Sequence, residues 1–308
     1  MTLQQLEYIL AVNQFRHFGK AAEHCHVTQP TLSAMIQKLE EELDVKLFDR
    51  SLQPIEPTPI GEKVVLQARR ILNEANQIRD LVEEEQDSMV GTFRLGILPT
   101  IAPYLLPRFY PQFIEKYPML HMQVTEMKSS EIEKQLNEGE LDAAIMATKP
   151  QQKGMQEEAL FYEEFYGYIA TQEPVFNQEF IKTSDISGKH LWLLDEGHCF
   201  RDQLVKFCNM EGVQNSRMAY RLGSMETFMR MVESGKGITI IPELSLSQLN
   251  TCQQELVRPF AIPRPTRKIR LITPTHFVRH TLLGRLKEEI LKTISKDMLE
   301  LKQTQYLV

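Results

Sequence analysis

Two cysteines nine residues apart are the side chains of this sequence best suited to redox chemistry. Cys199 lies between His198 and Arg201, just after an apolar run at 191–194 that is typical of a buried strand. A helical pattern then leads to Cys208. A thiol at the start of a helix and beside cationic groups has a lowered pKa, so more of it is the nucleophilic thiolate. Acidic neighbours oppose this shift, and the sequence leaves the balance open.

The spacing of these two thiols suits a switch. A thiolate that reacts with hydrogen peroxide becomes a sulfenic acid, which condenses with a nearby thiol to form a disulfide. If the intervening segment is largely helical, the cysteines stand up to roughly 13 Å apart, whereas a disulfide needs Cα atoms within about 7 Å. The bond would then close only when the segment unwinds. The alternative is that both cysteines are small buried hydrophobes without redox function.

The run EGHCFRDQ at residues 196–203, followed by Cys208 at this spacing, resembles the redox centre of the peroxide-sensing members of the LysR family of transcriptional regulators. The resemblance extends over essentially the whole chain. It implies that Cys199 is the peroxidatic thiol and that Cys208 is its resolving partner. It also implies that hydrogen peroxide is the signal and that a cellular dithiol reductant reverses the oxidation.

The first 58 residues predict a helix-turn-helix. A second short helix begins near His17, and Thr28 is expected to cap a third helix, with Pro30 in its first turn. Apolar residues at helical spacing give this third helix a predicted buried face, formed by Leu32, Ile36, Leu39 and Leu43. Two short helices joined by a tight turn, the second opening with small polar side chains, are typical of DNA-binding modules.

Residues 21–50 closely resemble the DNA-binding segment of the LysR family, and residues 54–61 resemble its wing. The resemblance implies that residues 1–58 form a winged helix-turn-helix that binds double-stranded promoter DNA. The candidate DNA-contacting residues are Thr28, Gln29, Pro30, Thr31, Ser33, Ala34, Lys38 and Arg50.

The charge of this domain departs from a typical DNA-binding surface. Residues 1–58 hold five Lys or Arg residues and eight acidic ones, so a test for a basic domain fails. Ala34 and Gln53 also stand where basic residues are common in the family. The alternative that the pattern alone permits is a helical module for protein interaction.

Residues 59–91 form the predicted linker and dimerisation helix, ending in a hinge. Apolar or small residues recur there at alternate spacings of four and three, namely Val64, Ala68, Ile71, Ala75, Ile78 and Val82. That spacing is typical of a coiled-coil seam, so we expect a homodimer or homotetramer. A dimer would present two recognition helices to half-sites about one turn of DNA apart, or a multiple of that. The alternative is a helix that packs within its own subunit.

Residues 92–308 alternate predicted strands and helices, which places this domain in the α/β class. Strands are expected at 93–98, 120–126, 141–147, 165–170, 191–194, 237–242 and 268–273. This part resembles the two-lobed, Rossmann-like effector domain of LysR regulators, which is related to periplasmic solute-binding proteins. The resemblance implies a regulatory domain with lobe I at about 92–163 plus 268–308 and lobe II at about 164–267.

Open sheets of this class bind small ligands at the carboxyl ends of their strands, where several polar residues are expected. Thr100 and Ser129 are predicted to orient peroxide, while His198 and Asp202 hydrogen-bond it and help to protonate the leaving hydroxide. The resemblance supports Thr100, His198, Cys199 and Asp202, whereas the family usually has threonine at position 129. The alternative is that each hydroxyl only caps a helix. No metal-ligand spacing is evident, and no cofactor is predicted.

Length and composition limit the remaining possibilities. A chain of 308 residues with 42% hydrophobic residues predicts two or three domains with substantial cores. The sequence lacks an apolar run of about 18 residues and a signal peptide, so no membrane contact is expected. Four cysteines fit a reducing cytoplasm. The net charge of -6 argues against general nucleic-acid affinity but permits a local binding patch.

The combined interpretation is a cytoplasmic, peroxide-activated transcriptional regulator that acts with RNA polymerase and is not an enzyme. Two rival hypotheses stay open. One is a LysR-type regulator that senses a small metabolite, with incidental cysteines. The other is a thiol peroxidase, although an enzyme of that kind has no need of residues 1–91.

Overall fold

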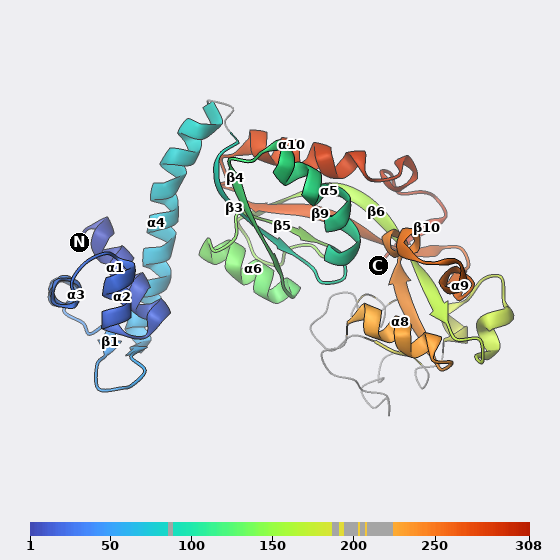
Figure 1. The fold of residues 1–308 in the computed structure, drawn as a ribbon, viewed down its shortest axis with the longest axis horizontal. Helices are drawn as coiled ribbons and strands as arrows, with labels where there is room; N and C mark the ends of the chain where they lie inside the picture. Colours follow the sequence, from blue (N-terminus) through green and yellow to red (C-terminus); the bar gives the residue numbers. More distant parts are fainter. Residues whose placement is uncertain (86–88, 187–190, 194–202, 204–206, 208–223) are drawn as a thin grey trace. The chain divides into compact units, whose positions relative to one another are not determined.

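The computed structural model describes residues 1–85, 89–186, 191–193, 203, 207 and 224–308. The chain divides into two compact units, Met1–Asp87 and Ser88–Val308 (Figure 1). His198, Cys199, Asp202 and Cys208 lie outside the described residues. None of the helices in the described part of the chain has the length and apolar composition that a membrane span needs.

The first unit is built from short helices, a small sheet and one long helix. Its elements in chain order are α1 (Leu3–Phe15), α2 (Phe18–His24), α3 (Gln29–Leu43), β1 (Phe48–Asp49), β2 (Glu56–Pro57) and α4 (Pro59–Glu85). β1 and β2 pair antiparallel and form the wing after the helix-turn-helix. The short helices and the first half of α4 enclose one apolar cluster.

Local chemistry explains where the predicted recognition helix, α3, begins and ends. The Thr28 side chain accepts a hydrogen bond from the Thr31 backbone N–H at 3.4 Å, which confirms the predicted cap. Pro30 lies in the first turn, where its missing N–H leaves no partner unsatisfied. Asp44 ends the helix in the left-handed conformation, with φ of 52°.

Some apolar residues of α3 and α4 lie in the core of the first unit, and others are exposed to solvent. The predicted buried positions Leu32, Ile36 and Leu39 are fully buried. The prediction for Leu43 was wrong, because the chain reverses at Asp44 and leaves that side chain 39% exposed. On α4, Ala68 is buried within the unit, as the alternative to a coiled coil expects, whereas Ile78 and Val82 are 66% and 54% exposed.

In the second unit, one twisted sheet passes through two lobes, with strand order β4-β3-β5-β9-β6-β7. In the first lobe, β3 (Gly91–Ile97) pairs parallel with both β4 (Leu120–Glu126) and β5 (Ala143–Met146). The long strands β6 (Met155–Ile169) and β9 (Arg264–Pro274) are antiparallel to each other and join the lobes. In the second lobe, β6 pairs with β7 (Ile238–Pro242) and β8 (Val257–Pro259).

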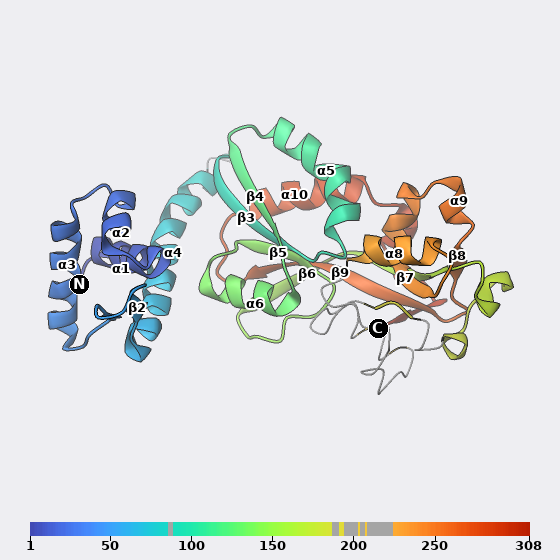
Figure 2. The ribbon, with the colours of Figure 1, turned by 60° about the horizontal axis from the view of Figure 1, so that its bottom comes forward.

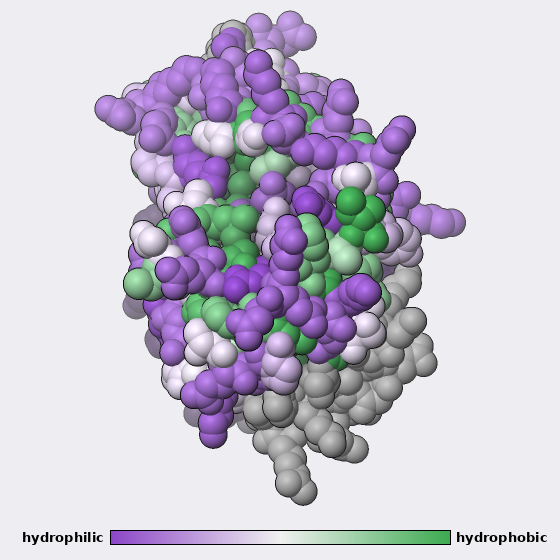
Figure 3. Space-filling view, turned by 90° about the vertical axis from the view of Figure 1, so that its right-hand side faces the viewer, coloured by the Kyte–Doolittle hydropathy of each residue, from purple (hydrophilic) through white to green (hydrophobic). Residues whose placement is uncertain are grey.

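Helices cover both faces of the first-lobe sheet. α5 (Ala102–Lys116) and α10 (His280–Lys292) lie on one face, and α6 (Ser129–Glu138) lies on the other (Figures 1 and 2). In the second lobe, α8 (Met225–Glu233) packs on β7, and the short α9 (Thr251–Gln254) follows. Buried apolar side chains of both lobes form one continuous core. On the face shown in Figure 3, polar side chains predominate and apolar ones are visible only in separate areas.

The strand predicted at 165–170 is only the second-lobe end of β6, which begins at Met155. The sequence obscures the first part of this strand, because Glu163 and Glu164 interrupt its apolar pattern. Both side chains are nonetheless buried, and their cationic partners Arg267 and Arg264 come from β9, about a hundred positions further along the chain. A local pattern cannot reveal charge compensation of this kind.

Three glutamates meet where β6 leaves β9 and begins to pair with β7. Glu243 follows β7, and its carboxylate accepts a hydrogen bond from the Glu164 backbone N–H at 3.0 Å. Burial raises the pKa of Glu243 to about 6, with Glu164 and Glu163 adding to the rise and Lys302 opposing it. The folded chain therefore holds a proton on Glu243 more tightly than the unfolded chain does.

This pKa shift predicts that Glu243→Gln stabilises the protein in a pH-dependent way. Above about pH 6, the folded chain must bury the Glu243 charge, whereas the amide carries none. The gain should be about 1 kcal/mol at pH 8 and should fall as the pH drops through 6 toward 4.5. Urea unfolding at pH 8 and pH 5 measures it, with Glu300→Gln as an exposed control. An equal gain at both pH values would contradict the assignment.

Candidate nucleic-acid interface and redox pocket

Most of the candidate DNA-contacting residues share the exposed face of α3 and its first turn. Thr28, Gln29, Pro30, Thr31, Ala34 and Lys38 are exposed, and Ser33 is half-buried. The hydroxyls of Thr28 and Thr31 lie 2.8 Å apart and hydrogen-bond each other. The structure thus brings these predicted residues together on one polar helical surface. Helices in the major groove present surfaces of this kind to base edges and phosphates.

Glu40 lies on the buried side of α3 and ties the helix to the wing. Its side chain is only 1% exposed. One carboxylate oxygen accepts hydrogen bonds from the backbone N–H groups of Leu47, at 2.8 Å, and Phe48, at 3.4 Å. The other accepts a bond from Arg50 Nη2 at 3.1 Å. We call this set of four residues the wing clamp. It joins α3 to the segment that contains β1.

Arg50, a predicted DNA-contacting residue, is oriented by this clamp. Its Nη1 donates to Ser33 Oγ at 3.3 Å, and its guanidinium carbon stands 5.0 Å from the centre of the Phe18 ring. The Arg50 side chain remains 38% exposed, so part of it faces solvent at the edge of α3. Because the Glu40 charge is compensated inside the domain, that acid opposes phosphate binding less than a simple charge count suggests.

In the second unit, three hydroxyl residues follow the carboxyl ends of the parallel strands. Thr100 follows β3, Ser129 follows β4, and Thr148 follows β5. Backbone bonds hold these strand ends together: Met127 N donates to Ile97 O at 3.1 Å, and Leu98 N donates to Ile145 O at 3.3 Å. This is the edge at which α/β sheets bind small ligands.

Thr100 does not cap α5, so the alternative role considered for it is wrong. The helix is capped by Ile101 without a side-chain hydrogen bond. Instead, Arg267 Nη1 donates to Thr100 Oγ1 at 3.0 Å, and Arg267 Nη2 donates to Thr100 O at 3.0 Å. A guanidinium offers only donors, so the Thr100 hydroxyl must accept this bond. The Thr100 hydroxyl proton is therefore not used in the bond with Arg267.

Arg267, the partner of the candidate residue Thr100, was not predicted from the sequence. Its side chain is fully buried, and its Nε donates to Glu163 Oε2 at 2.8 Å. Glu163 Oε1 in turn accepts a bond from Leu244 N at 3.0 Å. In the sequence, Arg267 is merely one of three cationic residues in the stretch RKIR at 267–270. Its significance depends on Glu163 and Thr100, which are distant in sequence.

Ser129 also lacks the capping role considered for it. It is the first residue of α6, and the capping position is Lys128, which makes no side-chain cap bond. The Ser129 Oγ is buried and has no hydrogen-bond partner among the described residues, and the same holds for Thr148 Oγ1. By contrast, Ser224 does cap α8, because its Oγ accepts from Thr227 N at 3.1 Å. Buried hydroxyls without partners at a strand end suit a polar ligand.

Of the predicted redox segment, the structure describes only Gln203 and Phe207 between the two cysteines. Gln203 is 8% exposed, and its Nε2 donates to Ala147 O at 3.3 Å, at the end of β5. The placement of Cys199, Cys208, His198 and Asp202 around Thr100 therefore stays a prediction. Within the described residues, no group of three or more His, Cys, Asp or Glu could hold a metal ion.

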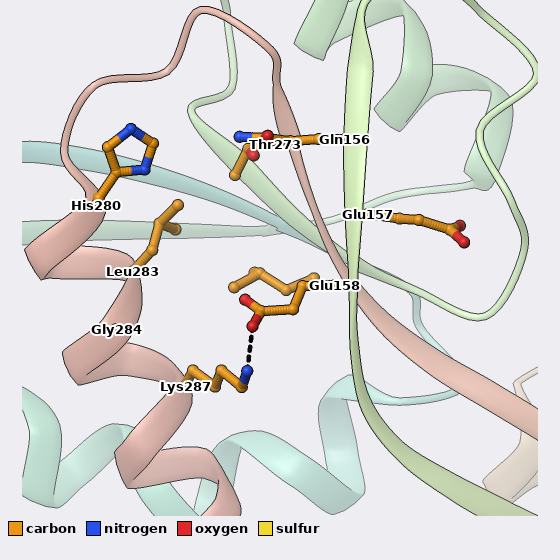
Figure 4. Close-up of a pocket in the computed structure, with 9 residues that line it drawn as sticks. Gln156, Glu157, Glu158, Thr273, His280, Leu283, Gly284 and Lys287 are labelled. Atoms are coloured by element: carbon orange, nitrogen blue, oxygen red, sulfur yellow. Dashed lines mark hydrogen bonds and ion pairs between the residues drawn. The ribbon is translucent and has the colours of Figure 1, made fainter.

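A surface cavity of about 490 Å³ lies elsewhere in the first lobe, between α10 and the strands β6 and β9. Figure 4 shows Gln156, Thr273 and His280 around it, with the Lys287–Glu158 ion pair at one end and Glu157 pointing away. None of the predicted site residues lines this cavity.

Comparisons with known proteins cover both units. Residues 3–62 match the family described as bacterial regulatory helix-turn-helix protein, lysR family, and residues 86–294 match LysR substrate binding domain. A "Hydrogen peroxide-inducible genes activator" of Dickeya chrysanthemi is 37% identical over 88% of this chain and 89% of its own. The "DNA-binding transcriptional dual regulator OxyR" of Escherichia coli K12 is 35% identical over the same shares.

Solved structures give the same result. OxyR from Porphyromonas gingivalis is 46% identical, with a TM-score of 0.67 over 71% of this chain and 99% of that one. A full-length OxyR variant from Pseudomonas aeruginosa is 33% identical, with a TM-score of 0.81 over 98% of this chain and 99% of that one. These matches confirm the predicted fold class, a winged helix-turn-helix followed by a linker helix and a two-lobed effector domain. The chain belongs to the LysR family of transcriptional regulators.

Proposed function

We propose that this protein is a hydrogen-peroxide-sensing transcriptional regulator of oxidative-stress genes. Two observations together carry the proposal. The chain has the Cys199–Cys208 pair, and relatives that match 88% of it are named hydrogen peroxide-inducible genes activators. Residues 1–58 bind promoter DNA, residues 59–91 link and dimerise, and residues 92–308 sense peroxide, with lobe I at 92–163 plus 268–308 and lobe II at 164–267. The regulator acts in the cytoplasm, together with RNA polymerase.

In the proposed reaction, the Cys199 thiolate attacks one oxygen of hydrogen peroxide. The O–O bond breaks, Cys199 becomes a sulfenic acid, and the leaving hydroxide takes a proton with help from His198 and Asp202. Cys208 then displaces hydroxide from the Cys199 sulfur to form the disulfide. A cellular dithiol reductant restores both thiols and is itself oxidised to a disulfide.

Thr100 and Ser129 orient the peroxide in this scheme. The proposal for Thr100 is supported by its bond from Arg267, which leaves the Thr100 proton to be donated to a peroxide oxygen. Ser129 adds a buried hydroxyl without a described partner. In this scheme, hydrogen bonds from these hydroxyls to the peroxide oxygens lower the barrier to O–O cleavage.

On DNA, α3 is proposed to enter the major groove with residues 28–38, while Arg50 reaches a phosphate at the groove edge. The exposed side chains of Ile78, Leu81 and Val82 on α4 support self-association, because a single chain leaves them in water. A homodimer, or a homotetramer, would pair two such DNA-binding units. Oxidation changes how the paired units sit on the promoter.

The first test replaces the reactive sulfur. Cys199→Ser should abolish peroxide-dependent transcription while DNA binding persists, because the hydroxyl does not react with peroxide as a thiolate does. Cys252→Ser removes an exposed free thiol and should leave the response intact. Peptide mapping of the oxidised wild-type protein should find Cys199 joined to Cys208. A peroxide response in Cys199→Ser would refute the proposal and favour a metabolite sensor.

The second test concerns the Thr100 hydroxyl. Thr100→Val keeps the shape but removes the proton donor, so sulfenic acid formation at Cys199 should slow about tenfold, the value of one good hydrogen bond. Thr100→Ser keeps the hydroxyl and should react at nearly the wild-type rate. Stopped-flow measurement of thiol loss at several peroxide concentrations gives both rate constants. Equal rates for the valine and serine variants would exclude Thr100 from the reaction.

The third test concerns the wing clamp. Glu40→Gln keeps an oxygen that can accept the Leu47 N–H but loses the charge that orients Arg50. Affinity for promoter DNA should fall about tenfold, because charge-assisted bonds to Arg50 are worth about 1.5–3 kcal/mol. Glu42→Gln removes an exposed acid of the same helix and should bind at least as tightly as wild type. Fluorescence anisotropy at fixed salt measures both, and thermal unfolding confirms that the variants are folded.

A further inference from the structure

One wall of the surface cavity in the first lobe is formed by the strands β6 and β9. Gln156 pairs with Thr273 across the two strands, and Glu158 pairs with Leu271. Both pairs line the cavity, because alternate residues of a strand share one side of the sheet. Glu157 lies between the two pairs and points away (Figure 4). Leu271 and Thr273 are only 2% and 4% exposed, so they form a floor with one aliphatic surface and one hydroxyl.

The helix α10 forms the opposite wall with four residues at helical spacing, His280, Leu283, Gly284 and Lys287. Gly284 lies in the interior of the helix, where glycine is less favourable than alanine. Apart from its chain neighbours and the helix backbone, a Cβ atom at this position would meet no heavy atom within 4 Å. No close packing therefore requires a glycine here, and its missing side chain leaves the middle of this wall open.

Three polar side chains gather at one end of the cavity, namely those of Gln156, Thr273 and His280 (Figure 4). In the described part of the chain, none of these three side chains forms a hydrogen bond with another residue. Thr273 is the most informative of them, because buried hydroxyl groups are normally hydrogen-bonded in proteins. At the other end, Lys287 forms an ion pair with Glu158, so the two charges compensate each other.

We propose that this cavity binds an uncharged, planar aromatic molecule that carries an amide group on its rim. A flat ring fits between the aliphatic side chains of Leu271 and Leu283, in the space that Gly284 leaves open. The volume of about 490 Å³ lies in the range of small-molecule sites.

The polar end of the cavity selects the head group of this ligand. A hydroxyl, a carboxamide and an imidazole can each donate and accept hydrogen bonds, and an amide group does both as well. A carboxylate only accepts hydrogen bonds and an ammonium group only donates them, so either would use half of what these side chains offer. Because Lys287 is already paired with Glu158, it is not available to a carboxylate.

This site does not depend on the proposed function, because its described lining residues belong neither to the predicted redox pocket nor to the DNA-contacting surface. The ligand would nonetheless contact β6 and β9, and these strands carry Glu163 and Arg267 further along. It would therefore bind the same structural element that positions Thr100.

Nicotinamide and nicotinate test the chemical class of the ligand, because they carry an amide or a carboxylate on the same ring. Nicotinamide should bind the full-length protein with a Kd of about 1 mM, as suits a ligand of about nine non-hydrogen atoms. Nicotinate should bind about fivefold more weakly, because it cannot donate a hydrogen bond from its head group. Titrations followed by saturation-transfer NMR measure both. Absence of nicotinamide binding at about 20 mM, or nicotinate binding as tight as that of nicotinamide, would overturn the inference.

Gly284→Leu tests the position of the site, and Gly284→Ala is its matched control. The leucine side chain should occupy the open space and weaken nicotinamide binding more than about tenfold. Both variants should raise the thermal midpoint by about 2–4 °C, because leucine and alanine are better helix formers than glycine. The alanine variant adds only a methyl group and should bind within about twofold of wild type. Nicotinamide binding by Gly284→Leu at the wild-type affinity would place the ligand elsewhere and refute the proposal.

A second pair of variants examines the floor hydroxyl. Thr273→Val keeps the shape of the side chain and should weaken nicotinamide binding about tenfold, the value of one good hydrogen bond. Thr273→Ser keeps the hydroxyl and should bind nearly as wild type does. Equal affinities of the valine and serine variants would show that the hydroxyl does not contact the ligand, contrary to the proposal.

Discussion

The buried ion pair between Arg267 and Glu163 is the constraint on which the second unit depends. Burying two charged side chains away from water costs free energy unless every polar atom of the pair forms a hydrogen bond. Here the hydrogen-bond partners come from both lobes. Arg267 binds Thr100 of the first lobe, and Glu163 accepts a bond from the Leu244 N–H of the second. In other proteins, replacing a buried ion pair by apolar residues of similar volume is often neutral or stabilising. We infer that the pair is retained for what it positions, namely the Thr100 hydroxyl.

A similar device orders the DNA-binding unit. Glu40 lies on the buried side of α3, and residues of the wing compensate its charge. This acidic residue therefore holds the helix against the wing and repels DNA phosphates little. In each unit, a buried carboxylate forms hydrogen bonds that connect separate segments of the chain, Glu40 in the first and Glu163 in the second. Each also orients an arginine whose remaining contacts face the proposed site, Ser33 in one unit and Thr100 in the other.

The residues proposed to orient peroxide lie at the carboxyl ends of the parallel strands of the first lobe. The parallel strands bring Thr100, Ser129 and Thr148 to one edge, and the Gln203 side chain donates a hydrogen bond to Ala147 O at that same edge. The Phe207 ring lies beside those of Phe260 and Tyr306, with ring centres 5.7 Å and 6.3 Å apart.

Local chemistry in the sequence was enough to determine the helix-turn-helix, the Thr28 cap, the buried face of α3 and most strands of the effector domain. These features depend on residues a few positions apart, so their periodicity and capping can be recognised without knowing which distant residues they contact. The cysteine pair and the DNA-contacting residues were also assigned from sequence, and they remain predictions. Only the tertiary structure decided the start of β6, the exposure of Leu43, the true partner of Thr100 and the role of Arg267. Those features depend on side chains roughly a hundred or more positions apart or on where a chain turns, and no local pattern records which distant charge will compensate a buried one.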